Sequence, residues 1–282
     1  RTGTNNLEPE ETESINIGAV ITPTFLPGLT LTVDYWRIQQ DGIVGVFGDD
    51  NAIALDLLRR LQGGTNPNVI REDPDDDQIA LFAGTGLDAV GDVVLVQDPY
   101  FNLDSRTVKG WDFGMFWDFG NIAGLGNLDI AFNGAYLDSF FQSPGSDGQE
   151  LLAAVADGTL PDSSVISDIG ELRQQNGRPK WRWTSTVNFE SGPVDLRLFA
   201  RYVGSVYDDS VTQNGTDING NPNPDPGSFY PVDDWFTLNL SMSYSFEEGA
   251  LDGTRFRFGI NNLFGSAPPL ADQSYGYFSN LH

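Results

Sequence analysis

The chain has no cysteine and only one histidine, His282, among its 282 residues. A disulfide-stapled scaffold is excluded, because such domains need several cysteines. Zinc sites draw their ligands mainly from cysteine and histidine, and a nucleophilic triad needs a histidine held by a carboxylate. With neither residue type to spare, the sequence predicts no catalytic residues, no enzyme activity and no organic cofactor.

Long hydrophobic runs and basic charge are missing as well. No stretch approaches the roughly 18 to 20 apolar residues of a membrane-spanning helix, and the mean hydropathy is -0.26. Lys and Arg number 15 against 40 Asp and Glu, which gives a formal net charge of -25. Because nucleic-acid binding needs a basic surface that displaces counterions, a nucleic-acid partner is excluded along with a helical membrane protein.

What the sequence does contain is strict alternation of apolar and polar residues. From Phe236 to Phe246 every second residue is apolar, and the residues between are small and polar. Successive side chains of a strand point to opposite faces, so this segment predicts a strand with one apolar face and one polar face. A tilted strand that spans a bilayer needs about 9 to 11 residues. The segment therefore has the length and pattern of one strand of a transmembrane β-barrel.

The alternation recurs along the chain, in residues 14–24, 28–45, 93–118, 127–141, 179–190, 193–208, 232–247 and 254–265. Short turns rich in Gly or Pro alternate with long segments that carry most of the acidic surplus. Outer-membrane barrels have short turns on the periplasmic side and long loops outside. We therefore predict an all-β fold, an antiparallel transmembrane β-barrel segment of about eight strands with long extracellular loops and short periplasmic turns.

Alternation also assigns each side chain to a face. The apolar face is expected to contact lipid and the polar face to line a wet interior, because a charge facing lipid at mid-depth costs about 2 to 4 kcal/mol. The lipid-facing set is Ile15, Ile17, Ala19, Ile21, Leu29, Leu31, Val33, Tyr35, Trp111, Phe113, Met115, Trp117, Leu128, Ile130, Phe132, Tyr136, Trp181, Trp183, Val187, Phe189, Val194, Leu196, Leu198, Tyr202, Phe256, Phe258 and Ile260. The interior set is Asn16, Thr32, Asp34, Asp112, Asp129, Asn133, Arg182, Asn188, Asp195, Arg197, Arg201, Thr237, Asn239, Arg255, Arg257 and Asn261.

Large aromatic residues gather near the predicted strand ends, and they are Tyr35, Trp36, Trp117, Tyr136, Trp181, Trp183, Tyr202, Trp235 and Tyr244. An indole or phenol has an apolar body and a polar tip, so it favours the boundary between hydrocarbon and headgroups. These residues predict an aromatic girdle; the alternative is that they fill the core of a soluble sandwich.

Two of the long segments contain helical patterns. In residues 52–61 the spacing of Ile53, Leu57 and Leu61 predicts a helix, with Asn51 as its N-cap and Gly63 as its stop. A second short helix is predicted over residues 150–156. Both helices are expected to fold the outer loops down as caps.

Five short motifs, in order along the chain, carry a resemblance to a known family. They are Asn6-Leu7-Glu8-Pro9-Glu10, Val108-Lys109-Gly110-Trp111-Asp112, Pro179-Lys180-Trp181, Arg201-Tyr202-Val203-Gly204 and Gly259-Ile260-Asn261-Asn262-Leu263-Phe264. Together they resemble the C-terminal half of the barrel of TonB-dependent outer-membrane receptors. Such receptors are energised transporters whose barrel of about 22 strands is plugged by an N-terminal domain.

The resemblance implies that residues 1–282 are the C-terminal portion of such a barrel, with the plug domain and the final strand absent from this sequence. It implies an outer-membrane active transport receptor of a Gram-negative bacterium that takes up a scarce or bulky nutrient, such as a siderophore, a vitamin or a glycan. The implied partners are membrane lipid, lipopolysaccharide, the nutrient and the TonB complex, the last through the missing N-terminal part.

The interior face supplies the candidate substrate residues. Arg182, Arg197, Arg201, Arg255 and Arg257 are expected to form a basic ladder down one wall, which either pairs with carboxylates of the plug or of the barrel, such as Asp195, or guides an anionic or hydroxyl-rich substrate. Interior or loop aromatics either stack on sugar rings or pack the loops, and they are Trp36, Tyr207, Phe229, Tyr230 and Trp235.

One segment suggests a metal site. Asp217, Asn219, Asn221 and Asp225 place oxygen ligands at intervals around Gly220, as in the first half of a calcium loop, but the closing bidentate Glu is missing. Ordinary Gly, Asn and Pro loop chemistry is the alternative to calcium here. The acidic run from Glu72 to Asp77 is a second candidate, for divalent cations that bridge to lipopolysaccharide.

Two rival classes fit parts of the pattern. A passive porin or a structural, adhesive outer-membrane barrel would share the strands without energy coupling, and an N-terminal plug in the full-length protein would exclude it. A soluble β-sandwich binding module would instead bury the apolar face against a second sheet.

Overall fold

The computed structural model describes residues 6–161, 166–212, 229–274 and 276–282. The chain divides into two compact units. The first unit comprises Arg1–Glu13, Ile38–Thr107 and Phe140–Leu172, and the second comprises Ser14–Arg37, Val108–Ser139 and Arg173–His282. The first unit thus consists largely of two long inter-strand segments, and the second holds most of the long strands.

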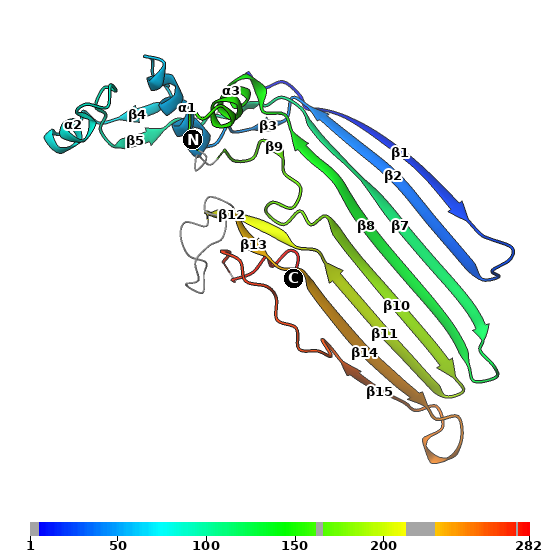
Figure 1. The fold of residues 1–282 in the computed structure, drawn as a ribbon. Helices are drawn as coiled ribbons and strands as arrows, with labels where there is room; N and C mark the ends of the chain where they lie inside the picture. Colours follow the sequence, from blue (N-terminus) through cyan, green and yellow to red (C-terminus); the bar gives the residue numbers. More distant parts are fainter. Residues whose placement is uncertain (1–5, 162–165, 213–228, 275) are drawn as a thin grey trace. The chain divides into compact units, whose positions relative to one another are not determined.

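The main sheet is a meander of eight strands (Figure 1). In their order across the sheet they are β1 (Glu11–Ile21), β2 (Leu29–Asp41), β7 (Arg106–Asn121), β8 (Asn127–Gln142), β10 (Trp181–Ser191), β11 (Val194–Val203), β14 (Trp235–Ser245) and β15 (Arg255–Ile260). The short β9 (Gly170–Glu171) pairs with β8 off this path. Order across the sheet equals order along the chain, so the predicted arrangement of eight neighbouring strands is confirmed.

Two of the predicted strands extend too far toward their long loops. In the predicted strand 93–118, residues 93–105 do not join the sheet: β5 (Val93–Val96) pairs with β4 (Val69–Arg71), and β6 (Phe101–Asn102) pairs with β3 (Val44–Gly45). Pro99 lies between these short strands, where it has no N–H to donate to a sheet ladder. The predicted strand 28–45 likewise ends at Asp41, because Gly42 takes the left-handed conformation with φ 64°.

The same correction applies near the C-terminal strands. The predicted strand 193–208 ends at Val203, and β12 (Val206–Thr212) pairs instead with β13 (Phe229–Val232). Gly204 marks the break, where a Cβ would lie 2.9 Å from the carbonyl oxygen of Trp181. The predicted strand 254–265 ends at Ile260, shortly before Asn262, which has φ 52°.

The strand register places the two predicted faces on opposite sides of the sheet. Across β10, β11 and β14, Val187 lies opposite Leu198 and Leu198 lies opposite Leu240. The next residues alternate to the other face, where Asn188 lies opposite Arg197. Since directly opposed residues of neighbouring strands share a face, one side of the sheet is apolar and the other is polar and charged.

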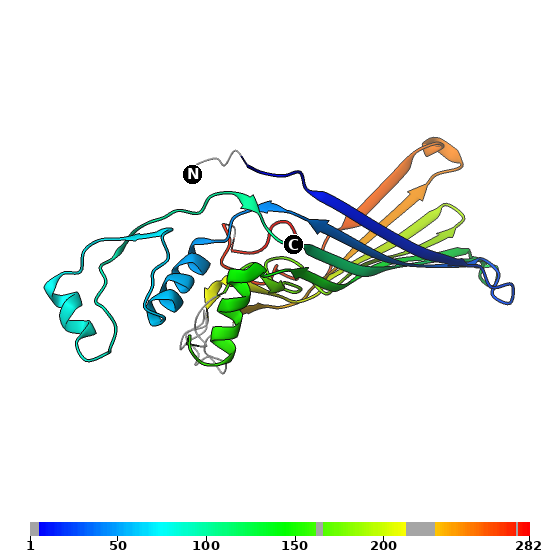
Figure 2. The ribbon, with the colours of Figure 1, turned by 90° about the horizontal axis from the view of Figure 1, so that it is seen from above.

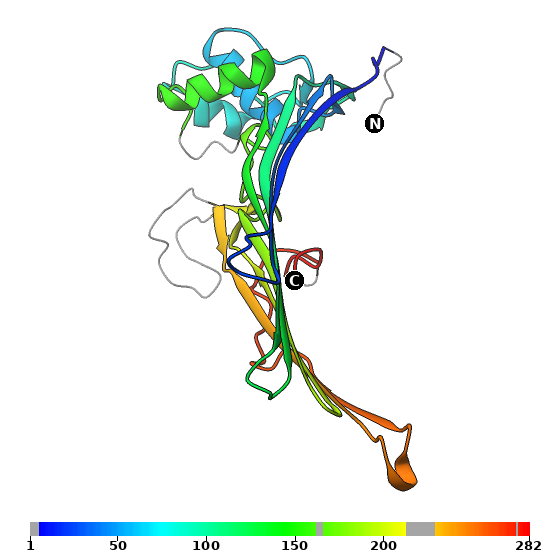
Figure 3. The ribbon, with the colours of Figure 1, turned by 90° about the vertical axis from the view of Figure 1, so that its right-hand side faces the viewer.

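The apolar face has no second sheet packed against it among the described residues. Figure 3 shows the eight-stranded sheet edge-on as a single layer. Ile17 is 68% exposed and Phe258 is 61% exposed, although both are large hydrophobic residues. A sandwich would cover such residues, so the structure contradicts the soluble β-sandwich interpretation.

Aromatic rings contact one another near both ends of the strands on this apolar face. Toward the long loops, Tyr35 lies 5.0 Å from Trp111, Tyr136 lies 4.6 Å from Trp181, and Trp183 lies 5.5 Å from Tyr202 between ring centroids. Toward the tight turns the rings in contact are Trp117 with Phe119, Tyr244 with Phe246, and Phe246 with Phe256. Two such girdles, one at each interface, are typical of transmembrane barrels.

Two residues assigned to the girdle lie on the other face. Trp235 is opposite Val203, which is opposite Arg182 on the polar face. Tyr35 faces the apolar side, where it contacts Trp111, so the next residue, Trp36, faces the other side. The ring of Trp36 covers Gly110. For these two aromatics the girdle assignment is wrong, and their place is with the polar residues.

Helices build the core of the first unit (Figure 2). Helices α1 (Asp49–Leu61) and α3 (Gly145–Ala156) lie side by side and enclose an apolar cluster of Leu55, Leu58, Leu151, Ala154 and Leu160. Both helices match predicted ones, but each begins earlier than expected. A third, α2 (Asp76–Phe82), was not predicted, although Asp75 and Gln78 form a complete capping box at its start. No helix among the described residues is long and apolar enough to cross a membrane.

The expected N-cap of α1, Asn51, has a different role. The helix begins after Gly48, and Asn51 lies within its first turn and is completely buried. Its Nδ2 donates to the carbonyl oxygens of Phe47 and Ser167, at 2.7 and 3.0 Å, and its Oδ1 accepts from the amide of Ser167. Asn51 therefore joins α1 to a segment more than one hundred residues away.

Asp56 is the centre of a buried ion-pair network in the first unit. Its side chain is fully buried, and its Oδ2 accepts from Nε of Arg60 and from Nε of Arg71, both at 2.9 Å. Its Oδ1 accepts from the amide of Asn66 at 3.0 Å. Burial alone would raise the pKa of this carboxyl, but the bonds from Asn66, Arg60 and Arg71 outweigh burial and lower it below its usual range.

We expect acid to loosen the first unit through Asp56. A carboxyl whose pKa is lower in the folded state contributes stability above its unfolded value of about 3.9, and that contribution is lost as the pH falls through the folded-state pKa. The protection of the α1 amides against hydrogen exchange, relative to the intrinsic rate at each pH, should therefore fall below about pH 4. Protection of the α1 amides that is unchanged down to pH 2 would contradict this assignment.

Candidate functional site

The five arginines of the predicted ladder all lie on the polar face of the second unit. Arg197 is opposite Ser241, Arg201 is opposite Thr237, and Arg182 is opposite Val203 on the same side. On the last strand, Arg257 is opposite Ser243 and Arg255 is opposite Ser245. In a chain with a net charge of -25, a third of the 15 basic residues thus share one face of the sheet.

Two of these arginines have partners. Arg255 forms an ion pair with Asp195, and both groups bond to Ser243 Oγ, which accepts from Arg255 Nε at 3.0 Å and donates to Asp195 Oδ2 at 2.8 Å. Arg201 donates to the carbonyl oxygen of Leu281 at 2.5 Å, and its guanidinium lies 5.8 Å from the ring centroid of Trp235. Pairing with Asp195 therefore accounts for one arginine only.

The other three are open on this face. Among the described residues, Arg182, Arg197 and Arg257 form no hydrogen bond and no ion pair, and all three are exposed. A guanidinium keeps its charge and presents five donors in a fixed fork. The polar face therefore offers donors to a ligand that carries hydroxyl or anionic acceptors.

Part of this face is hollowed. A cavity of about 440 Å³ is lined by Thr32, Asp112, Asn133, Arg182, Thr184, Arg201, Asn280 and Leu281, with neighbouring backbone. Two hydroxyls, two amides and a carboxylate thus accompany the two arginines. The C-terminal segment closes one side, where Phe278 and Leu281 join a buried cluster with Val203, Val206 and Val232.

The predicted interior and loop aromatics are dispersed. Trp235 lies beside Arg201 on the polar face and donates from Nε1 to the carbonyl oxygen of Ser266 at 3.3 Å. Tyr230 packs against the buried cluster around Val232, while Tyr207 on β12 is 42% exposed. Phe229 lies in β13, at a register position opposite Thr212. Trp36 covers Gly110, so no single aromatic platform brings these five residues together.

The calcium prediction on Asp217, Asn219, Asn221 and Asp225 lies outside the described residues. Within the part of the chain that the structure describes, no three acidic or histidine side chains are placed to hold a metal ion. In the acidic run, Asp75 caps α2 by accepting from the amide of Gln78 at 2.8 Å. Both metal suggestions stay predictions.

Gly110 provides the space that Trp36 occupies. A Cβ at this position would lie 2.5 Å from the carbonyl oxygen of Tyr136 and 2.6 Å from Cζ2 of Trp36. We expect Gly110→Ala to displace the indole and to destabilise the folded sheet by about 1 to 3 kcal/mol. The thermal unfolding midpoint of the purified protein in detergent would measure the loss.

Gly259→Ala is the matched control, because its Cβ would meet only the carbonyl oxygen of Leu240, at 3.7 Å. It should leave the midpoint nearly unchanged. Equal midpoints for the two variants would show that Trp36 does not need the space over Gly110.

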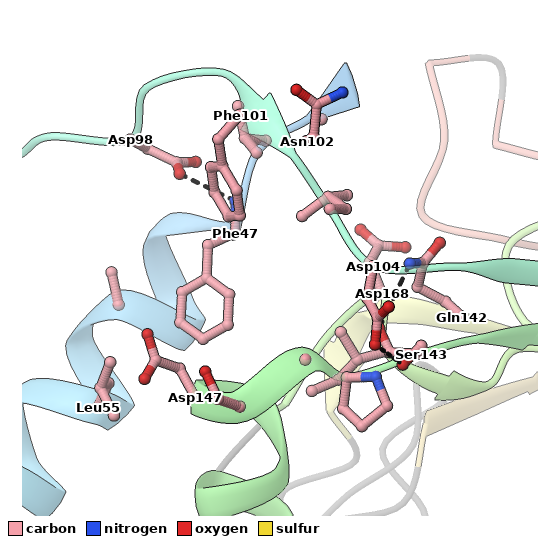
Figure 4. Close-up of a pocket in the computed structure, with 18 of the residues that line it drawn as sticks. Phe47, Leu55, Asp98, Phe101, Asn102, Asp104, Gln142, Ser143, Asp147 and Asp168 are labelled. Carbon is pink, nitrogen blue, oxygen red and sulfur yellow. Dashed lines mark hydrogen bonds between the residues drawn. The ribbon is translucent and has the colours of Figure 1, made fainter. Parts of the chain in front are cut away.

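A second candidate site lies in the first unit, where loops and helices enclose a cavity of about 600 Å³ (Figure 4). Its lining comes from four separated segments, residues 45–55, 66–68, 97–106 and 142–147, together with Asp168 and Ile169. The walls include the rings of Phe47 and Phe101 and the carboxylates of Asp98, Asp104, Asp147 and Asp168.

No local sequence pattern unites the residues of this cavity, so the sequence alone does not predict it. Asn51 places the segment around Ser167 beside α1, and Ser143 Oγ donates to Asp104 Oδ2 at 2.5 Å. Each of these contacts joins residues at least 39 positions apart. Spacing along the chain carries no signal for contacts of this range.

A single-layer sheet with a lipid-like face, two aromatic girdles and a polar face that carries arginines defines a strand-built membrane protein. The model of the TonB dependent receptor-like beta-barrel family matches residues 1–263, so the chain belongs to this family. Receptors of this family are transporters of the Gram-negative outer membrane and not enzymes. A search of curated protein sequences found no match.

Solved structures of related form include three iron or siderophore receptors. The FrpB iron transporter from Neisseria meningitidis is 10% identical, with a TM-score of 0.46 over 94% of this chain and 29% of that one. A mutant of the ferric enterobactin receptor from Pseudomonas aeruginosa is 11% identical, with a TM-score of 0.47, over 90% and 26% of the two chains. The siderophore receptor PirA from Acinetobacter baumannii is 13% identical, with a TM-score of 0.48, over 92% and 28%. This chain therefore spans less than a third of each receptor.

Proposed function

We propose that residues 1–282 are the C-terminal portion of the barrel of an outer-membrane active transport receptor from a Gram-negative bacterium. The receptor takes up a scarce or bulky nutrient with energy coupled through TonB. The plug domain and the final strand then belong to parts of the full-length receptor outside this sequence.

The observation that carries the proposal is the division of the sheet into two faces. One face is apolar from β8 to β15 and has aromatic contacts near both strand ends, as contact with membrane lipid requires. The other face carries arginines, carboxylates, amides and hydroxyls, as a wet passage requires. Membership of the receptor family supports active uptake over a passive porin.

Each part of the chain then has a role. The polar face lines the passage, where Arg182, Arg197 and Arg257 meet the acceptors of a passing nutrient. The long segments lie outside and contact the nutrient first, and their acidic residues lie near lipopolysaccharide. The TonB complex acts through the N-terminal part of the receptor.

Uptake in cells with and without TonB tests the proposal. Transcript induction of the receptor gene on iron starvation or on defined glycans would first identify the nutrient, and a radiolabelled form of it would then be supplied. We expect accumulation in cells with TonB and only the background of a receptor deletion in cells without it. Equal accumulation in both would instead indicate a passive barrel.

A further inference from the structure

The cavity of the first unit combines aromatic rings with polar side chains (Figure 4). Phe47 and Phe101 lie on one side, next to the carboxylates of Asp147 and Asp98, and the group of Asp104, Asp168, Gln142 and Ser143 lies on the other. Phe101 is 40% exposed, so the fold does not cover its full surface. A volume of about 600 Å³ is within the range of pockets that bind small organic ligands.

Most of the carboxylates in the lining already have partners within the fold. Asp98 accepts from the amides of Phe47 and Gly48, both at 3.1 Å, at the start of α1. Asp104 accepts from Ser143 Oγ, and Asp147 pairs with Arg59. Asp168 is the one lining carboxylate that accepts no hydrogen bond from any described residue. The lining therefore stays acidic, and Asp168 is the carboxylate whose acceptor oxygens remain available to donors of a ligand.

An anionic ligand is disfavoured by this lining. The four carboxylates of the lining face a single cation, Arg106. Its Nε donates to Oε1 of the buried Gln142 at 2.9 Å, and its guanidinium lies 5.4 Å from the ring centroid of Phe140. Arg106 is thus already engaged, and its one charge does not balance the surrounding carboxylates.

The lining side chains that form no hydrogen bond within the fold include both donors and acceptors. The side chains of Asn68, Gln97, Ser146 and Asp168 line the cavity and form no hydrogen bond to a described residue. An amide or a hydroxyl both donates and accepts, whereas a carboxylate only accepts. The best match is a ligand whose own groups also do both, which is the property of hydroxyls on a sugar ring.

We propose that this cavity binds a neutral, polyhydroxylated ligand, namely a short oligosaccharide. Its C–H ring face stacks on Phe101 and its hydroxyls bond to Asn68, Gln97 and Asp168. The inference rests on the proposed function, because it assigns the nutrient class to a site in the long segments of an uptake receptor.

The test is binding of maltotriose, cellotriose and chitotriose to the purified full-length receptor in detergent, measured by calorimetry. We expect at least one trisaccharide to bind, and Phe101→Ala to weaken that binding by about tenfold. Phe82→Ala is the matched control, because Phe82 lies on α2 in the same unit and does not line the cavity. It should bind as the unchanged receptor does.

Asp168→Asn distinguishes a sugar from a cation. The amide keeps a carbonyl acceptor for a hydroxyl, so affinity for a trisaccharide should fall by no more than about threefold. Spermidine and citrate serve as cationic and anionic probes. The proposal is overturned if no trisaccharide binds, if Phe101→Ala has no effect, or if spermidine or citrate binds in place of the sugars. The calorimetry is done without TonB, so failure of the trisaccharides to bind would contradict the sugar site but not TonB-coupled uptake. Conversely, uptake that does not depend on TonB would contradict the proposed function but not the sugar site.

Discussion

Replacing Leu240 with Arg is expected to block assembly of the receptor into the membrane. Leu240 lies in the middle of β14, opposite Leu198 on one side and Ile260 on the other, within the apolar face. An arginine on the lipid face at mid-depth costs about 2 to 4 kcal/mol, a large fraction of ordinary folding stability. Heat-modifiable mobility of the outer-membrane fraction on gels would measure the assembled protein.

Asn239→Arg is the matched change one residue earlier. Asn239 is on the polar face opposite Phe199, so its replacement extends into the passage and the charge stays hydrated. This variant loses one hydrogen bond, from the amide of Asn262 to Asn239 Oδ1, at a cost of about 1 kcal/mol. It should assemble far better than Leu240→Arg, and equal assembly of the two would reverse the assignment of the faces.

Replacing Asp56 with Ala is expected to unfold much of the first unit. The change leaves Arg60 and Arg71 without the carboxylate that both contact and frees the amide of Asn66. Removal of one partner from a buried ion pair destabilises by about 3 to 5 kcal/mol. Hydrogen exchange of the α1 and α3 amides should approach the unprotected rate, while the amides of β10 and β11 keep their protection.

Asp50→Ala provides the control for Asp56→Ala, because Asp50 lies exposed in the first turn of the same helix. It should retain nearly full protection of the α1 amides. The Asp56→Ala variant should also lose the acid-dependent step described above. Protection that is the same in both variants would mean that the network around Asp56 does not hold the first unit together.

The eight strands and their faces could be predicted because they depend on local alternation. Leu196, Leu198 and Tyr202 lie where the two-residue period places them, opposite Met242, Leu240 and Phe236. Contact with lipid requires this alternation, because every residue on the apolar face of the sheet has the same apolar surroundings. For Trp36 and Trp235 the alternation left both the girdle and the interior open, because an indole suits both an interface and a polar wall beside an arginine or a glycine; the structure places both on the polar face.

The loop unit could be predicted only in part, because its structure depends on contacts between distant residues. The helix pattern around Leu57 and Leu61 was visible, but the true partner of Asn51 is Ser167. The capping box of Asp75 and Gln78 lies within a run of acidic residues, which masks it as a helix start in the sequence. Phe101 and Asp168 meet in one cavity through tertiary packing alone, for which a single sequence has no periodic signal.

Because each long strand pairs with the next along the chain, the size of a connection has little influence on the stability of the wall. The entropy of closing a loop rises only with the logarithm of its length, at about 0.6 kcal/mol per doubling. The segment 42–105 is only a few doublings longer than the nine-residue connection 246–254. Its closure therefore costs only a few times that amount more. Large insertions and deletions can accumulate between strands at small thermodynamic expense, so ligand preference is free to diverge among receptors while the spanning framework is kept.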